Sequence, residues 1–336
     1  MRTKIAVLLP HGDARTYFIT DGVLKRLGEI GEVRVNERDY SADVMKEMLK
    51  DADICLTGWG CPALTKDILD GAPEIKLVVH TGGTVAALVS DELYLRGIKV
   101  ISANALYAES VAEGALAYML TGLRRIPYFA QKVQEGVWRK DPYQNKGLLN
   151  RKVGLLGFGA IARELVPLLK AFKCEIMVCD PKLTREECEK QGLIYADSIE
   201  TLFLNSEVVS LHVPLTDDTY HIVNKRILSL LPDGALLVNT ARGSVVDEAA
   251  LTEELKTGRV GAVLDVFEKE PLPMDSPLYG LPNAVLLPHI AGPTTERLEG
   301  VTFFLIEDIM RFLKGEPLKY EISKEYAAAM TRERGG

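Results

Sequence analysis

Short apolar runs alternate along most of the chain with amphipathic stretches that repeat at helical spacing. The apolar runs predict buried β-strands, and the amphipathic stretches predict helices. In the first third of the chain we expect strands at Ile5–Leu9, Val33–Asn36, Ile54–Thr57, Lys76–Val79 and Lys99–Ser102, with helices near Asp21–Leu27 and Ala42–Lys50. Alternation of this kind is typical of a parallel sheet covered by helices on both faces.

The alternation resumes after a long helical pattern that begins after Asn104 and a second helix over Tyr128–Gln134. Further strands are expected at Val153–Leu156, Cys174–Asp180, Val208–His212, Ala235–Asn239, Val260–Val266 and Ala284–Pro288, and a final helix at Thr294–Leu313. A length of 336 residues suggests about two domains. We take Asn104 as the first crossing between them.

A glycine-rich turn follows the strand Val153–Leu156 and opens a helical pattern. In such a turn Gly157 permits a tight bend, Gly159 lets the backbone approach a pyrophosphate, and Ala162 keeps the helix close to its strand. The helix N-terminus supplies free N–H groups for the phosphates. A plain strand-to-helix turn uses the same glycines, but the surrounding strand, helix and second strand favour a dinucleotide site.

The second strand ends in Asp180, about 20 residues after the glycines, where a carboxylate that binds a ribose 2′-OH belongs. An acid at this position repels a 2′-phosphate and favours NAD over NADP as the cofactor. An ordinary strand-end turn would also explain Asp180. Lys182 and Arg185 lie close by and leave some use of NADP open.

Composition excludes several classes of protein. The net charge is −7 without a basic patch, which disfavours a nucleic-acid partner. No apolar stretch approaches the ~20 residues of a membrane span. The five cysteines show no paired spacing, so we expect reduced thiols in a cytoplasmic protein and no metal site.

Three loops after the later strands each carry one ionisable residue. Arg242 can hold a carboxylate in a two-pronged hydrogen-bonded pair. His289 is suited to exchange protons near neutral pH, and the acid Glu270 can hold it cationic. Each has an ordinary explanation as a surface or loop residue. Because the ends of parallel strands converge, together they predict a site for reducing a 2-keto acid.

The chain at this point resembles the D-isomer-specific 2-hydroxyacid dehydrogenases, which include D-glycerate, glyoxylate/hydroxypyruvate and 3-phosphoglycerate enzymes. The resemblance covers about residues 75–315. It rests on motifs in a fixed order: Arg96–Val100, Ser110–Glu113, Val153–Gly159, Ser210–Thr216, Asn239–Gly243 with Val246–Asp247, Asp265–Phe267 with Glu270–Pro271, and Pro288–Gly292.

The resemblance implies an NAD-dependent enzyme with a catalytic triad of Arg242, Glu270 and His289. Arg242 would bind the substrate carboxylate, His289 would be the acid in reduction and the base in oxidation, and Glu270 would stabilise the imidazolium. The implied cofactor-binding residues are Gly157, Gly159, Ala160, Ile161, Asp180, His212, Val213, Pro214, Thr240, Ala241, Asp265, His289 and Gly292. The implied substrate-binding residues are Gly82, Gly83 and Arg242. His80 stands where many relatives carry arginine, and it either faces the substrate too or simply closes its strand.

The implied fold consists of two doubly wound α/β domains of Rossmann and flavodoxin type. Residues 1–104 and 294–336 would form the substrate domain, and residues 105–293 the inserted NAD domain. A homodimer is implied, with Trp138 either in the dimer arm or a packing anchor. Feedback by serine is not expected, because the sequence lacks the regulatory domain of longer 3-phosphoglycerate dehydrogenases.

Two departures from the family pattern leave the substrate open. The loop Gly82–Leu88 lacks the acids that the family usually carries there, and Ala160 replaces a residue that is often basic. An NAD(H)-sensing, corepressor-like protein on the same scaffold is the main alternative, although the chain shows no docking extension. A formate-dehydrogenase-like enzyme is disfavoured because Glu270 stands where that branch carries an amide.

Overall fold

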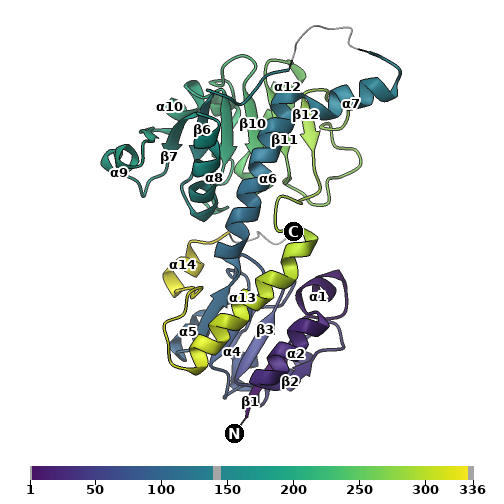
Figure 1. Ribbon diagram of the computed structural model, residues 1–336, viewed down its shortest axis with the longest axis vertical. Helices are drawn as coiled ribbons and strands as arrows, with labels where there is room; N and C mark the ends of the chain where they lie inside the picture. Colours follow the sequence, from purple (N-terminus) through teal and green to yellow (C-terminus); the bar gives the residue numbers. More distant parts are fainter. Residues whose placement is uncertain (1, 139–144, 332–336) are drawn as a thin grey trace. The chain divides into compact units, whose positions relative to one another are not determined.

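The computed structural model describes residues 2–138 and 145–331, and the chain divides into two compact units (Figure 1). Unit 1 combines both ends of the chain, Met1–Tyr107 and Pro293–Gly336, and unit 2 is Ala108–Gly292. The chain passes from unit 1 to unit 2 within the long helix α6 (Asn104–Arg124), a few residues after the crossing expected at Asn104. The predicted architecture of two parallel-sheet α/β domains is confirmed.

Unit 1 is built on a five-stranded parallel sheet in the order β2-β1-β3-β4-β5, which is the flavodoxin-like order. The strands are β1 (Thr3–Val7), β2 (Gly31–Val35), β3 (Ile54–Thr57), β4 (Leu77–His80) and β5 (Lys99–Ser102). The helices are α1 (Asp13–Phe18), α2 (Asp21–Ile30), α3 (Ala42–Leu49), α4 (Lys66–Asp70), α5 (Asp91–Leu95), α13 (Thr295–Leu313) and α14 (Lys324–Ala328).

The core of unit 1 lies on both faces of this sheet. Successive residues of a strand point to opposite faces, so Ile5 and Val7 pack with α2 and α13, whereas Ala6 and Leu8 pack with α3 and α4. The helix α13 therefore buries its apolar stripe on the sheet of the first hundred residues (Figure 1). This packing explains why the final helix returns to unit 1.

Unit 2 is built on a seven-stranded parallel sheet in the order β12-β11-β10-β9-β6-β7-β8. The strands are β6 (Lys152–Leu156), β7 (Glu175–Cys179), β8 (Ile194–Tyr195), β9 (Val208–Leu211), β10 (Leu236–Asn239), β11 (Gly261–Leu264) and β12 (Ala284–Leu286). The helices are α7 (Ile126–Gln134), α8 (Ala160–Ala171), α9 (Arg185–Lys190), α10 (Ile199–Leu204), α11 (Lys225–Leu228) and α12 (Glu248–Lys256), with a 3₁₀ turn at Gly243–Val245.

The strand order of unit 2 reverses between β6 and β9. Both strands are parallel neighbours there, and the crevice at such a switch point is where ligands of open α/β sheets bind. Helices α6 and α8 cover one face of the sheet, and α10, α11 and α12 cover the other. Across residues 2–138 and 145–331, no helix is long and apolar enough to cross a membrane.

Candidate active site

The glycine turn lies at the switch point of unit 2. Gly157 has a φ of +92°, and a Cβ there would stand 2.7 Å from the His212 carbonyl oxygen and close to Val213. Only glycine fits both the backbone angle and this contact. The turn after β6 thus packs directly on the segment after β9.

Gly159 differs from Gly157 because it faces open space. It is the N-cap residue of α8 with a φ of −78°, and a Cβ there would meet nothing within 4 Å. The exposed N-terminus of a 12-residue helix is an anion-binding position. Ala160 and Ile161, half-buried in the first turn, lie at this helix end.

Asp180 lies directly after β7 and points toward the glycine turn. Its carboxylate accepts hydrogen bonds from the backbone N–H groups of Phe158, at 2.7 Å, and of Lys182, at 2.7 Å. The carboxylate is thereby fixed beside Gly157–Gly159. This is the position that a ribose-binding acid requires in a dinucleotide site.

Buried polar atoms without partners gather at the ends of β9 and β10. Neither ring nitrogen of His212 has a hydrogen-bond partner in the described part of the chain, and neither does the Thr240 hydroxyl. Burial lowers the pKa of His212 to about 4. Unpaired buried groups cost free energy unless a ligand or water supplies partners. Together with the open space at Gly159, they fit a bound dinucleotide.

The remaining expected cofactor residues occupy the same edge of the sheet. Exposed Pro214 and half-buried Val213 follow His212, buried Ala241 follows Thr240, and Gly292 follows the His289 loop.

His289 and Glu270 form a direct pair. Nδ1 of His289 lies 2.8 Å from Oε2 of Glu270, and the other carboxylate oxygen accepts the N–H of Phe267 at 3.0 Å. The His289 side chain is half exposed, and its φ of +56° turns it out of the loop after β12. Because Nδ1 of His289 is paired with Glu270, Nε2 is the ring nitrogen that can face a substrate.

Arg242 lies at the end of β10, the strand next to β11. Its guanidinium donates to the carbonyl of Ala241 at 2.6 Å, and Asn239 holds the turn by donating to the Arg242 carbonyl. The next residue, Gly243, allows no side chain, because a Cβ would overlap the backbone of Phe267. The Arg242 turn is therefore pressed onto the loop that carries Glu270.

Asp265 has a different environment from the other acids. Its buried carboxylate accepts hydrogen bonds from the Tyr118 hydroxyl and from the backbone N–H groups of Ile290 and Ala291, at 2.9–3.0 Å. Three of about four acceptor positions are thus used within the protein. Asp265 thereby fixes the loop of His289, and its remaining acceptor position is the one left for the cofactor contact that the family resemblance implies.

The expected substrate residues of unit 1 gather at the ends of β3 and β4. His80 is 5% exposed, and its Nδ1 lies 2.9 Å from the Thr57 hydroxyl. Burial lowers the pKa of His80 to about 4, so the ring is neutral at pH 7. A Cβ on Gly82 would stand 2.5 Å from Nε2 of His80, while Gly83 is less crowded.

Two aromatic residues in this region were missed from the sequence. Trp59 is 53% exposed and makes edge contacts with Phe18 and Tyr107, and Tyr107 donates to the Thr81 carbonyl at 2.8 Å. The sequence signal that could have identified Trp59 is Gly58-Trp-Gly60, which directly follows a strand. The glycine loop after His80 follows the next strand in the same way.

Comparison with known proteins identifies the family. The model of the D-isomer specific 2-hydroxyacid dehydrogenase, NAD binding domain, matches residues 116–291. The hydroxypyruvate reductase of Thermotoga maritima is 35% identical over 286 residues, which cover 84% of this chain and 92% of that protein. A solved acyclic imino acid reductase in complex with NADPH and D-arginine is 25% identical, with a TM-score of 0.80 over 95% of this chain and 100% of that one.

Some relatives are much longer than this chain. The D-3-phosphoglycerate dehydrogenase of Methanocaldococcus jannaschii is 33% identical over 297 residues, which cover 88% of this chain and 56% of that protein. The chain thus spans about half the length of the 3-phosphoglycerate dehydrogenases that it matches. With its two sheets and its nucleotide-binding unit 2, the chain belongs to the D-isomer-specific 2-hydroxyacid dehydrogenase family, as its sequence motifs predicted.

Proposed function

We propose that this chain uses NAD(H) to interconvert a small 2-keto acid and its D-2-hydroxy acid, with Arg242, Glu270 and His289 as the catalytic residues. The observation that carries the proposal is the 2.8 Å pair of His289 and Glu270, next to the Arg242 turn. The three residues follow β10, β11 and β12, which are adjacent in the sheet. An acid, a histidine and an arginine at one sheet edge suit proton transfer to a carboxylate-bearing substrate.

The roles follow from the hydrogen-bonding capacity of each group. The Glu270 carboxylate accepts a hydrogen bond from Nδ1 of His289, which orients the ring and leaves Nε2 for the substrate. In reduction, Nε2 gives its proton to the keto oxygen, and in oxidation it takes the proton back from the hydroxyl. Arg242 binds the carboxylate and orients the keto group. The nicotinamide, when bound, supplies or receives the hydride.

The Gly82–Gly83 loop of unit 1 is proposed to bind an anion through its backbone. The N–H groups of the Gly82–Gly83 loop can hold a carboxylate, since such loops form anion-binding concavities. His80 is neutral at physiological pH and cannot serve as a cation for that carboxylate. We therefore assign it to shaping the loop, because its ring fills the space beside Gly82.

The cofactor is proposed to be NAD. Asp180 is held beside the glycine turn by two backbone donors, where it would bind a 2′-OH and repel a 2′-phosphate. The acyclic imino acid reductase of similar structure binds NADPH, so the choice of dinucleotide varies on this fold.

All five cysteines are unpaired, which supports a protein that works in the reducing cytoplasm.

Variants of the proposed triad test the assignment. We expect His289→Ala to lower kcat/KM for the best 2-keto acid by roughly 10²- to 10⁴-fold, because general acid–base groups contribute about that much. Arg242→Ala should also lower kcat/KM strongly, because the substrate carboxylate loses its two-pronged partner. NADH affinity, measured by fluorescence titration, should stay within about twofold. Near-normal turnover by His289→Ala would remove that residue from the proposed chemistry.

A further inference from the structure

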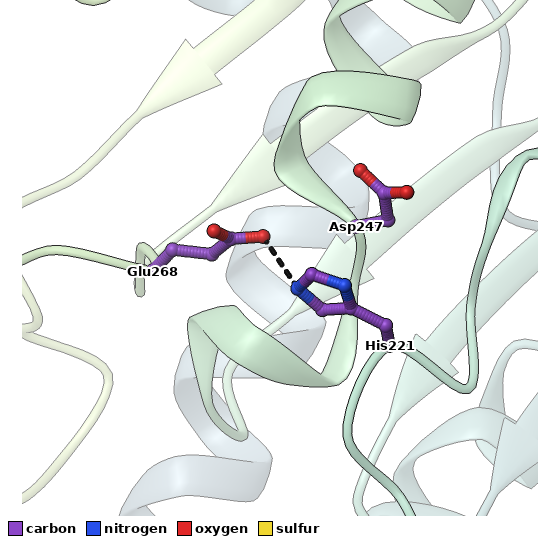
Figure 2. Close-up of side chains that lie close together, drawn as sticks. All are labelled: His221, Asp247 and Glu268. Carbon is purple, nitrogen blue, oxygen red and sulfur yellow. Dashed lines mark ion pairs between the residues drawn. The ribbon is translucent and has the colours of Figure 1, made fainter. Parts of the chain in front are cut away.

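A cluster of titratable side chains lies outside the proposed triad. Nε2 of His221 stands 2.8 Å from Oε1 of Glu268, and Asp247 lies close to the same ring (Figure 2). The ligand atoms of all three residues lie within 4.8 Å of one another. Tyr220 stacks on the ring at a centroid distance of 4.0 Å. The His221 ring thus has an acid at one nitrogen and an aromatic ring on one face.

Each member is tied to a different segment. The His221 N–H donates to the Ser244 carbonyl at 2.9 Å, which binds its loop to the turn that follows Arg242. The Glu268 carboxylate accepts the N–H of Glu248, and the Glu268 N–H donates back to the Glu248 carboxylate, at 2.9 and 3.0 Å. The cluster thus joins the His221 loop, the start of α12 and the Glu268 loop.

The carboxylate oxygens are already used by the protein. Asp247 caps α12 by accepting the N–H of Ala250 at 2.9 Å. One carboxylate oxygen of Glu268 accepts the N–H of Glu248 and also lies 2.8 Å from Nε2 of His221. Oxygens that already accept backbone N–H groups have less capacity for a cation. The arrangement therefore fits a histidine paired with Glu268 better than a metal site.

The Glu268 loop also carries Glu270. The N–H of Phe267 donates to the Glu270 carboxylate at 3.0 Å, and the other oxygen of that carboxylate holds His289 at 2.8 Å. The backbone of Phe267 and Glu268 lies against Gly243, where no Cβ fits. A shift of Glu268 must therefore move either the acid of the proposed triad or the Arg242 turn.

We propose that His221 is a positioning residue: its pair with Glu268 holds the Phe267–Glu270 loop against the Arg242 turn and so sets where Glu270 meets His289. This inference rests on the proposed function, because it needs Glu270 to act on His289. It adds a residue that touches neither the substrate nor the dinucleotide and that works only through Glu270.

A double-mutant cycle tests the proposal with NADH and hydroxypyruvate or glyoxylate. We expect His221→Ala to lower kcat by roughly 10- to 100-fold, since small misplacements of catalytic groups cost about that much, with the Kd of NADH unchanged. His221→Gln, whose amide N–H can still reach Glu268, should retain most activity. In a Glu270→Gln background, His221→Ala should cause no further loss.

The matched control is His11→Ala, which removes another histidine paired with an acid, Glu37, in an exposed part of unit 1. It should leave kcat unchanged. An equal loss from His221→Ala in both backgrounds would show a general structural effect and overturn the proposal. Full activity of Glu270→Gln would instead refute the proposed triad itself.

Hydrogen–deuterium exchange gives a readout that needs no substrate. Peptides covering residues 265–271 should exchange faster in His221→Ala than in the wild type or in His11→Ala, and unchanged exchange would contradict the proposal. Treatment of the wild type with EDTA should have no effect on kcat. Loss of activity with EDTA and its return with Zn²⁺ would make the cluster a metal site and overturn the positioning role.

Discussion

At the scale of single residues, the buried histidines make stability depend on pH. Burial lowers the pKa of His80 to about 4, whereas an unfolded histidine titrates near 6.5. Between these values the unfolded chain binds more protons, so stability is lost as the pH falls from about 6.5 to 4. At about pH 4 the free energy of unfolding should be about 3 kcal/mol lower because of His80 alone.

Urea unfolding at pH 7.5 and pH 5, followed by tryptophan fluorescence, checks this expectation. His80→Gln should show a smaller drop in its unfolding midpoint between the two pH values than the wild type. The exposed His11→Gln should behave like the wild type. An equal drop in all three proteins would mean that His80 is not the source of the acid sensitivity.

Individual roles were the hardest features to predict from the sequence. Arg242, Glu270 and His289 stood out because three ionisable residues followed neighbouring strands. The burial of His80, the three donors on Asp265 and the pairing of His221 with Glu268 depend on side chains brought together from distant segments. No local pattern encodes such contacts.

At the scale of elements, the two glycines of the turn between β6 and α8 are needed for different reasons, Gly157 for folding of the turn and Gly159 for binding of the cofactor. Gly157→Ala adds a Cβ at a φ of +92° and 2.7 Å from the His212 carbonyl, whereas Gly159→Ala adds one in open space. We expect Gly157→Ala to destabilise the protein by about 1–2 kcal/mol or more and to weaken NADH binding. Gly159→Ala should weaken NADH binding at an unchanged Tm.

Calorimetry and NADH titration on both variants measure the two effects separately. Normal NADH affinity in Gly159→Ala would show that no phosphate approaches this glycine.

The strands were predictable at this scale because apolar runs between breaks mark buried strands. The short helices α5 and α9 were not predicted.

At the scale of the whole molecule, we propose a homodimer that uses α7. This helix has no buried residue, and it exposes Ile126 and Val133, each 52% accessible, with Trp138 following it at 78%. Large apolar side chains exposed in one stretch mark an interaction surface. Light scattering should give the mass of two chains, and Ile126→Lys with Val133→Lys should give one. A wild-type monomer would refute the proposal.

The two-domain architecture was the most predictable feature of all. Alternating strands and helices specify parallel sheets, and the ordered motifs identified the family. The return of α13 to unit 1 followed from the family resemblance, and its physical reason is the apolar stripe buried on the unit 1 sheet. The substrate was not predictable from the sequence, because the Gly82–Leu88 loop departs from the family pattern. The position of Trp59 next to Gly82 was also not recognised from the sequence.

The central claim is tested most directly by oxidation of NADH with purified protein and a panel of 2-keto acids. The panel holds glyoxylate, hydroxypyruvate, pyruvate, phosphohydroxypyruvate and branched and aromatic keto acids, with NADPH run alongside. We expect rapid turnover of at least one small member, faster with NADH than with NADPH, and a D-2-hydroxy acid as the product. Tight NADH binding without turnover of any member would contradict the proposed enzyme and favour a sensor of NAD(H).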